Sequence, residues 1–209
     1  MTAGKHTAAL ETHTPQDDHL GLERLIFFSD AVFAIAITLL TLEIRLPPVE
    51  GSLSDAQLLR TLLAIWPRYL GYIISFLVIG IFWIGHHRKF SYIRRYDRNL
   101  LLINLLLLMA VAFIPFPTTV ISEYGNRTAT IFYALSITLV GLLSTALWAY
   151  ATHRQRLVDA RLTPQQKQRE MLRSLLMSGV FLLSIGIAFI HADAAKFSWL
   201  LIVLLLRRV

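Results

Sequence analysis

The chain has 209 residues, of which 56% are hydrophobic and 16% are charged, with a formal net charge of +7 and no cysteine. A soluble domain carries about 25% charged residues, so this composition excludes an ordinary soluble fold and indicates an all-α, polytopic membrane protein. The missing cysteines exclude disulfides and thiolate metal sites, and the basic residues lie in short segments between apolar runs, which indicates membrane topology rather than nucleic-acid binding.

The N-terminal segment, residues 1–20, is polar and holds a single Lys5. It lacks the charged start, short apolar core and small-residue cleavage site of a signal peptide. We therefore predict a disordered cytoplasmic tail over residues 1–20. Residues 21–209 are predicted to form one domain of six transmembrane helices.

Six apolar runs are long enough to be read as spans. The first is predicted to stop at Pro47 and Pro48, and the third at Pro115, because proline cannot continue a helix. Ser54 or Asp55 is predicted to cap the segment that follows. Residues 58–66 form either an interfacial turn or the same helix as the second span, kinked at Pro67. The predicted spans are 22–46, 67–85, 98–114, 128–150, 171–190 and 194–206.

Orientation follows from the distribution of lysine and arginine. If the N-terminus lies inside, 15 of the 20 Lys and Arg residues fall on the inner side, mostly in the loops around residues 88–98 and 154–173. Cytoplasmic loops carry this excess of positive charge. Both termini are therefore predicted to be cytoplasmic, which agrees with an even number of spans.

Asp30 lies inside the apolar run of the first span. An ionisable residue in a membrane helix is costly and indicates a functional site. The alternative is a structural role, in which a buried carboxylate fixes helix packing, and the sequence leaves both open. The partners of the Asp30 carboxylate should come from other helices. The Ser29 hydroxyl is expected to hydrogen-bond to a neighbouring helix. The candidate partners of Asp30 are His86, His87, Arg88 and Asn104.

The first helix also carries an apolar stripe. At 100° per residue, Ile35, Leu39 and Leu42 fall on one narrow face, and Thr38 lies about 60° to one side. An ordinary apolar face is the default for a helix in lipid, and a pore lining is the alternative. The stripe alone does not decide between them.

His86 and His87 are adjacent, so their side chains leave a helix in different directions and cannot easily bind one metal ion. We predict no metal site and no cofactor. One of the two histidines is expected to pack in the bundle and to hydrogen-bond Asp30 or Ser29. The chain also lacks a Walker motif, a nucleophile elbow, a carbonyl filter sequence and a loop large enough for a catalytic site, so it is not predicted to be an enzyme.

Several motifs in the first half of the chain resemble the transmembrane protein 175 family. They are Arg24-x-x-x-Phe28-Ser29-Asp30 with the Ile/Leu/Thr helix that follows, Ser75-Phe76 leading to Trp83-x-x-His86-His87-x-x-Phe90, and Asn104-Leu105 followed by Phe113-x-Pro115-Phe116-Pro117-Thr118. The resemblance implies a potassium-permeable channel in the plasma membrane. It also implies a homotetramer of six-helix subunits around a central pore lined by the first helix.

The resemblance assigns roles to particular residues. The pore and selectivity positions that it implies are Ile35, Thr38, Leu39 and Leu42, with an apolar constriction in place of a carbonyl filter. It also implies a polar network of Arg24, Ser29, Asp30, Trp83, His86 and His87.

Two other functions remain open. A proton channel or proton-coupled carrier would use Asp30 with His86 or His87 as a relay, since a carboxylate and an imidazole are the usual parts of such relays. A membrane scaffold would carry no flux. The expected partners are potassium ions or protons, the bilayer and identical subunits, with no nucleic acid.

Overall fold

The computed structural model describes residues 15–48 and 51–199, and these residues form helices joined by short loops. The helices are α1 (Pro15–Leu39, extended by the 3-10 turn η1, Leu40–Glu43), α2 (Asp55–Ala64), α3 (Trp66–Tyr92), α4 (Arg98–Phe113), α5 (Pro115–Tyr124), α6 (Arg127–Thr152, followed by the 3-10 turn η2, His153–Gln155), α7 (Pro164–Ala188) and α8 (Ala192–Ser198).

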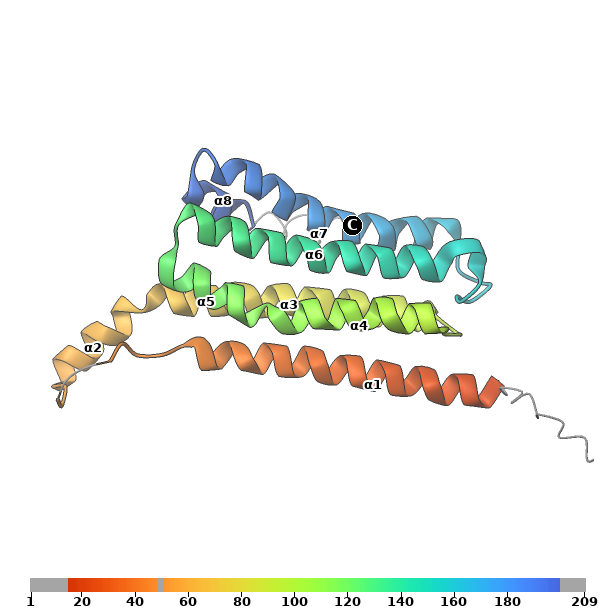
Figure 1. Cartoon of the computed structure of the whole chain (residues 1–209), viewed down its shortest axis with the longest axis horizontal. Coiled ribbons are helices and arrows are strands. Elements are labelled where there is room, and N and C mark those ends of the chain that lie inside the picture. Colours follow the sequence, from red (N-terminus) through yellow and green to blue (C-terminus); the bar gives the residue numbers. More distant parts are fainter. Residues whose placement is uncertain (1–14, 49–50, 200–209) are drawn as a thin grey trace, which may run out of the picture.

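The long helices run roughly alongside one another in layers (Figure 1). The first helix, α1, lies on one side, α3 and α4 form the middle, and α6 and α7 lie on the far side. The short helices α2, α5 and α8 gather at one end of the bundle. The loops between α3 and α4 and between α6 and α7 lie at the opposite end, where α1 begins. This second end holds the loops that the sequence assigns to the cytoplasm.

Side-chain caps explain where four of the helices begin. Ser54 starts α2 with a reciprocal capping box to Gln57, as the sequence suggested for Ser54 or Asp55. Asp97 caps α4 and Asn126 caps α6, in each case by accepting the backbone N–H three residues on. Thr163 forms a second capping box at the start of α7. The chain leaves α5 at Gly125, whose φ of 57° is the left-handed conformation that glycine tolerates.

Proline stands in the first turn of two helices. Pro67 stands in the first turn of α3, after a break at Ile65, so α2 and α3 are separate helices. The helix α4 ends at Phe113, close to the predicted end at Ile114, but the apolar span does not end there. The chain continues as α5, because Pro115 occupies the first turn of a new helix, where a missing N–H costs nothing. Helical residues therefore extend to Tyr124.

Five helices in the described residues are long and apolar enough to cross a membrane, namely His19–Glu43, Trp66–Tyr92, Arg98–Tyr124, Arg127–Gln155 and Pro164–Ala188. The predicted sixth span, 194–206, lies mostly outside the described residues. The same is true of residues 1–14 of the predicted tail, whereas residues 15–20 are part of α1.

Candidate functional site

The stripe predicted on α1 lies on its exposed side. Ile35 is 57% exposed, Leu39 39% and Leu42 62%, and Thr38 is exposed beside them. The Thr38 hydroxyl donates to the carbonyl of Ile35 at 2.9 Å. The protomer therefore leaves much of this apolar face of α1 and η1, with one hydroxyl on it, exposed.

The opposite side of α1 is buried against α3 and α4. Phe33 and Ala36 are each 1% exposed and Leu40 is fully buried. Burial of this second face fixes the rotation of the helix about its axis. Ile35 and Thr38 consequently lie on the exposed side of the helix, whereas Leu39 and Leu42 also line a cavity of about 350 Å³ with Phe113 and Phe116.

A polar network ties α1 to α3 and α4 through buried side chains. Ser29 is 0% exposed, Asn104 1% and His86 2%. The Asn104 amide nitrogen donates to Ser29 Oγ at 3.0 Å, and Asn104 Oδ1 lies 2.9 Å from His86 Nε2. His86 also stacks on Phe90, with ring centroids 4.3 Å apart. His86 is thus the packed histidine, and its partner is Asn104 rather than Asp30 or Ser29.

The directions of these hydrogen bonds follow from one another. The Ser29 hydroxyl donates to the carbonyl of Leu25 at 2.8 Å, so its oxygen is left to accept from Asn104 Nδ2. The amide oxygen of Asn104 then faces His86, and a carbonyl oxygen only accepts. His86 Nε2 must therefore carry the proton.

Asp30 lies one residue further along α1 and is only partly buried. Its Oδ1 accepts from the indole nitrogen of Trp83 at 2.8 Å. Trp83 also contacts His87, with ring centroids 5.9 Å apart. None of the four candidates named from the sequence bonds Asp30 in the described part of the chain. Arg24 is exposed and has no hydrogen-bond or ion-pair partner among those residues, so the network as described excludes it.

A second polar cluster, which sequence reasoning did not identify, lies between α3, α6 and α7. Lys89 is 2% exposed, and its ammonium donates to Ser144 Oγ and Ser174 Oγ at 2.6 Å each and to the Ser144 carbonyl at 3.1 Å. All three ammonium protons have an acceptor. The contacting residues are 55 and 85 positions apart in the sequence, so no local sequence pattern predicts these contacts.

Glu170 places a buried carboxylate beside that cluster. It is 4% exposed and pairs with Arg173 at 2.7 Å and with Arg88 at 3.3 Å. The sequence could have indicated this ion pair, because Glu170 is the only acidic residue between Asp159 and Asp193, and that stretch holds four Lys and Arg residues. A lone acid among bases indicates a paired charge.

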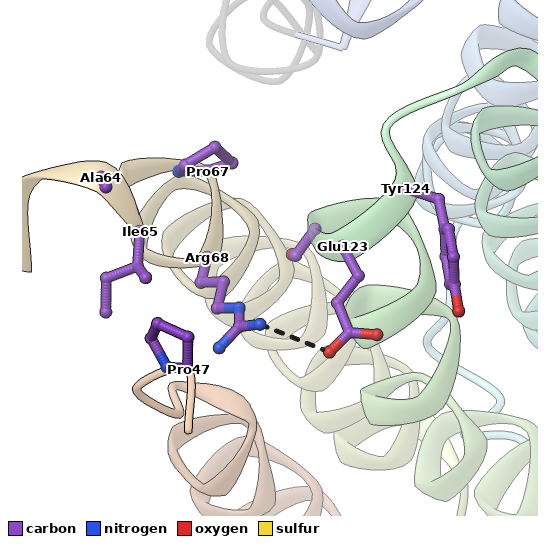
Figure 2. A pocket seen from close by; sticks show the side chains of 8 residues that line it. Pro47, Ala64, Ile65, Pro67, Arg68, Glu123 and Tyr124 are labelled. Atoms are coloured by element: carbon purple, nitrogen blue, oxygen red, sulfur yellow. Dashed lines mark ion pairs between the residues drawn. The ribbon is translucent and has the colours of Figure 1, made fainter. Parts of the chain in front are cut away.

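The end of the bundle that holds α2 and α5 has one charged contact that reaches α1. Figure 2 shows Arg68 of α3 and Glu123 of α5 pointing toward each other, with N and O 3.5 Å apart, beside a cavity of about 380 Å³. Arg68 also donates to the backbone carbonyl of Arg45, which follows η1. The Arg45 side chain in turn donates to the carbonyl of Leu42 at 3.1 Å. Arg68 thus links the C-terminal end of the α1 segment to α3 and α5.

At the other end, two loops are joined through Asp97. Its carboxylate accepts from Tyr150 Oη at 2.7 Å and from Arg156 at 2.5 Å, besides the cap on Leu100 N. Partial burial by itself raises the pKa of Asp97, but the hydrogen bonds from Leu100 and Tyr150 and the charge of Arg156 outweigh it and leave the pKa below its usual value. An antiparallel bridge between Ile93 and Val158 joins the same loops.

No group of three or more His, Asp or Glu side chains able to hold a metal ion occurs in the described part of the chain. The residues that come together are those of the membrane helices. Their arrangement can position a helix.

Comparison with known proteins gives consistent matches. The model of the family described as endosomal/lysosomal potassium channel TMEM175 matches residues 24–115. A potassium channel of Streptomyces collinus is 41% identical over 174 residues, which cover 81% of this chain and 83% of the relative. A potassium channel of Chamaesiphon minutus is 35% identical over 180 residues, which cover 84% and 87%.

A structural match and a longer animal relative agree with these. The crystal structure of a lysosomal potassium-selective channel TMEM175 homologue from Chamaesiphon minutus superposes with a TM-score of 0.79, at 31% identity, over 90% of this chain and 98% of that one. The endosomal/lysosomal proton channel TMEM175 of Gallus gallus is 33% identical over 147 residues, which cover 66% of this chain and 29% of that protein. The chain described here belongs to the TMEM175 family of membrane channels.

Proposed function

We propose that this chain is the subunit of a homotetrameric, potassium-permeable channel of the plasma membrane with cytoplasmic termini. The first helix of each subunit lines the central pore. Ile35 forms an apolar constriction there, with Thr38, Leu39 and Leu42 on the same wall. The family is one of ion channels, and the potassium channels of Streptomyces collinus and Chamaesiphon minutus are the relatives that support potassium as the ion.

The exposed stripe on α1 is the observation that carries this proposal. Ile35 and Leu42 are more than half exposed in the protomer, whereas Phe33 on the other face is 1% exposed. A face that the bundle leaves open is available to line a pore shared by several subunits. Because the buried face fixes the helix rotation, four copies would present the same side chains to one axis.

The chemistry of the stripe supports an apolar constriction. A ring of Ile35 side chains offers no ligand to an ion, and such a ring loses its water when it is narrow, which blocks ions without any change of charge. A wider ring passes hydrated or partly dehydrated cations. Potassium sheds its water more easily than sodium, so an apolar neck favours potassium.

In this proposal the polar network positions the pore helix. Ser29 fixes α1 to Asn104 and His86, and the Trp83 indole holds Asp30 one residue further along. His87 supports Trp83 through its ring contact. Arg24, which completes the family motif, is free in the protomer to contact a neighbouring subunit.

The substitution Ile35→Asn tests the constriction. An amide ring would hydrate the neck, so we expect a higher single-channel conductance and a lower potassium-to-sodium selectivity in planar bilayers. Ile73→Asn is the matched control, because Ile73 is 50% exposed on α3, away from the proposed pore. Unchanged conductance and selectivity in Ile35→Asn would remove Ile35 from the pore.

A proton pathway is the second candidate. It is favoured by the animal relatives named proton channels and by Asp30, whose described partner is an indole rather than a cation. This pathway predicts that Asp30→Asn abolishes flux driven by a pH gradient while the protein still folds and assembles. A structural Asp30 predicts loss of the assembled oligomer instead, which size-exclusion chromatography detects.

A further inference from the structure

Two loops form a basic surface at the end of the bundle where α1 begins (Figure 1). Residues 93–98 lead from the end of α3 to the first residue of α4, and residues 153–163 lead from the end of α6 to the start of α7. The two loops together hold six arginines and two aspartates, an excess of four positive charges. This surface adjoins the ends of four membrane spans, at the level where the polar head groups of a bilayer lie.

Backbone hydrogen bonds hold the two loops together. The N–H groups of Arg94 and Arg95 both donate to the carbonyl of Leu157, at 2.8 and 3.2 Å. In the other direction, the N–H of Asp159 donates to the carbonyl of Tyr92 at 2.8 Å. The backbone positions of the charged residues are therefore fixed relative to one another, as a binding surface requires.

Three arginines of this surface are left without an anion. The two acidic residues, Asp97 and Asp159, are each paired with an arginine of the same loops, at 2.5 and 3.1 Å. The exposed side chains of Arg95, Arg98 and Arg154 have no hydrogen-bond or ion-pair partner among the residues that the structure describes. A guanidinium group binds phosphate oxygens well, because its planar N–H donors match them two at a time.

An exposed apolar stripe on α4 begins at one of these arginines. Arg98 is the first residue of α4, and the stripe continues at spacings of four, three and four residues, which keep its members on one helix face. These members are Leu102, Leu105 and Met109, which are 48%, 53% and 65% exposed. A cation at the end of a span with apolar surface along the same helix face matches the head and the chain of a phospholipid. A soluble anion would use the arginine alone.

We propose that this surface binds an anionic phospholipid of the adjoining leaflet, with its phosphate on Arg95 and Arg98 and an acyl chain along Leu102 and Leu105. Arg154, on the other loop, adds to the attraction for a negative head group. A cluster of four or more basic residues directly beyond a membrane span is typical of sites for anionic lipids. This binding is independent of the ion that the channel conducts.

Native mass spectrometry of the full-length protein, with equal amounts of phosphatidylglycerol and phosphatidylcholine carrying the same acyl chains, tests the proposal. Each basic residue near the head groups contributes about fivefold, so two should make the wild type retain phosphatidylglycerol about 25-fold better. Arg95→Gln and Arg98→Gln should each lower this preference about fivefold and leave the retention of phosphatidylcholine unchanged. Arg60→Gln is the matched control, because it removes the same charge from an exposed position on α2, at the other end of the bundle, and should leave the preference unchanged.

Three results would overturn the site. If the wild type shows no preference, a neighbouring subunit or ions from solution satisfy these arginines. If Arg98→Gln and Arg60→Gln lower the preference equally, the net charge of the protein decides it and this surface does not. Exchange of acetate for phosphate in the spray buffer, at constant ionic strength, should leave the preference unchanged, and its loss there would mean that the surface binds a free anion instead of a lipid.

Discussion

Asn104 is the single side chain on which the contact between α1 and the rest of the bundle depends most. It donates to Ser29 and accepts from His86, so it satisfies two other buried polar groups at once. Lys89 plays the same part between α3, α6 and α7, where its ammonium has three acceptors. Polar groups inside a membrane protein are tolerated when partners of this kind are available.

Removing the Asn104 amide should therefore destabilise the protein. Asn104→Ala leaves Ser29 Oγ and His86 Nε2 without their partner, and we expect a loss of about 1–2 kcal/mol in the free energy of unfolding in mixed micelles. Leu105→Ala is the matched control, since Leu105 is 53% exposed on the same helix. If both variants lost the same free energy of unfolding, the hydrogen bonds of Asn104 would contribute nothing beyond the packing of its side chain.

At the scale of helices, charged contacts at both ends of the bundle decide how the segments meet. Arg68 joins the end of the α1 segment to α3 and α5, and Asp97 joins the loop before α4 to the loop after α6. Both contacts lie near the ends of the apolar spans. Each can be removed without disturbing the apolar packing between the helices.

Loss of Arg68 should loosen the end of the α1 segment. Because the chain has no cysteine, a single nitroxide label on Leu46→Cys reports motion at this point. Arg68→Gln removes the ion pair with Glu123 and weakens the contact with the Arg45 carbonyl, so the electron paramagnetic resonance spectrum should become that of a more mobile label. The control Arg60→Gln, at an exposed position on α2, should leave it unchanged. Identical spectra for the two variants would contradict a clamp at Arg68.

The pair at Asp97 predicts a dependence on pH. The pKa of Asp97 is lowered in the folded protein, so its contribution to stability is complete above its unfolded pKa of about 3.9 and is lost as the pH falls through the lower folded value. Asp97→Asn should lower the melting temperature at about pH 6. The difference between the variant and the wild type should shrink as the pH falls below about 3.9 and through the lower pKa of Asp97 in the folded protein. A difference that persists in acid would show that charge is not the cause.

The sequence predicts the five apolar spans seen in the described residues and the capped start of α2, because hydropathy and capping are local. It does not predict the continuation of helix past Pro115, since a proline that ends one helix can also begin the next. It also does not predict Lys89 among Ser144 and Ser174, because those contacts join distant parts of the chain. In the polar network, the sequence identifies Asn104 and His86 as candidates but not their pairing, which depends on how α3 and α4 pack together.

At the scale of the whole molecule, α1 is the least buried of the five spans in the described residues. In its most apolar stretch of 18 residues, only 22% of the residues are buried, compared with 50% in the corresponding stretch of each of the spans Arg98–Tyr124 and Arg127–Gln155. A helix with this much open apolar surface is suited to contact other subunits and a pore. The homotetramer proposed above would give that surface its partners.

Reversal potentials of the purified protein in planar bilayers, with opposed gradients of potassium, sodium and protons, test the proposed function most directly. A potassium-permeable channel predicts a reversal close to the potassium equilibrium potential and a loss of this preference in Ile35→Asn. A reversal that follows the proton gradient would contradict it and would move the conducting role from the stripe on α1 to Asp30.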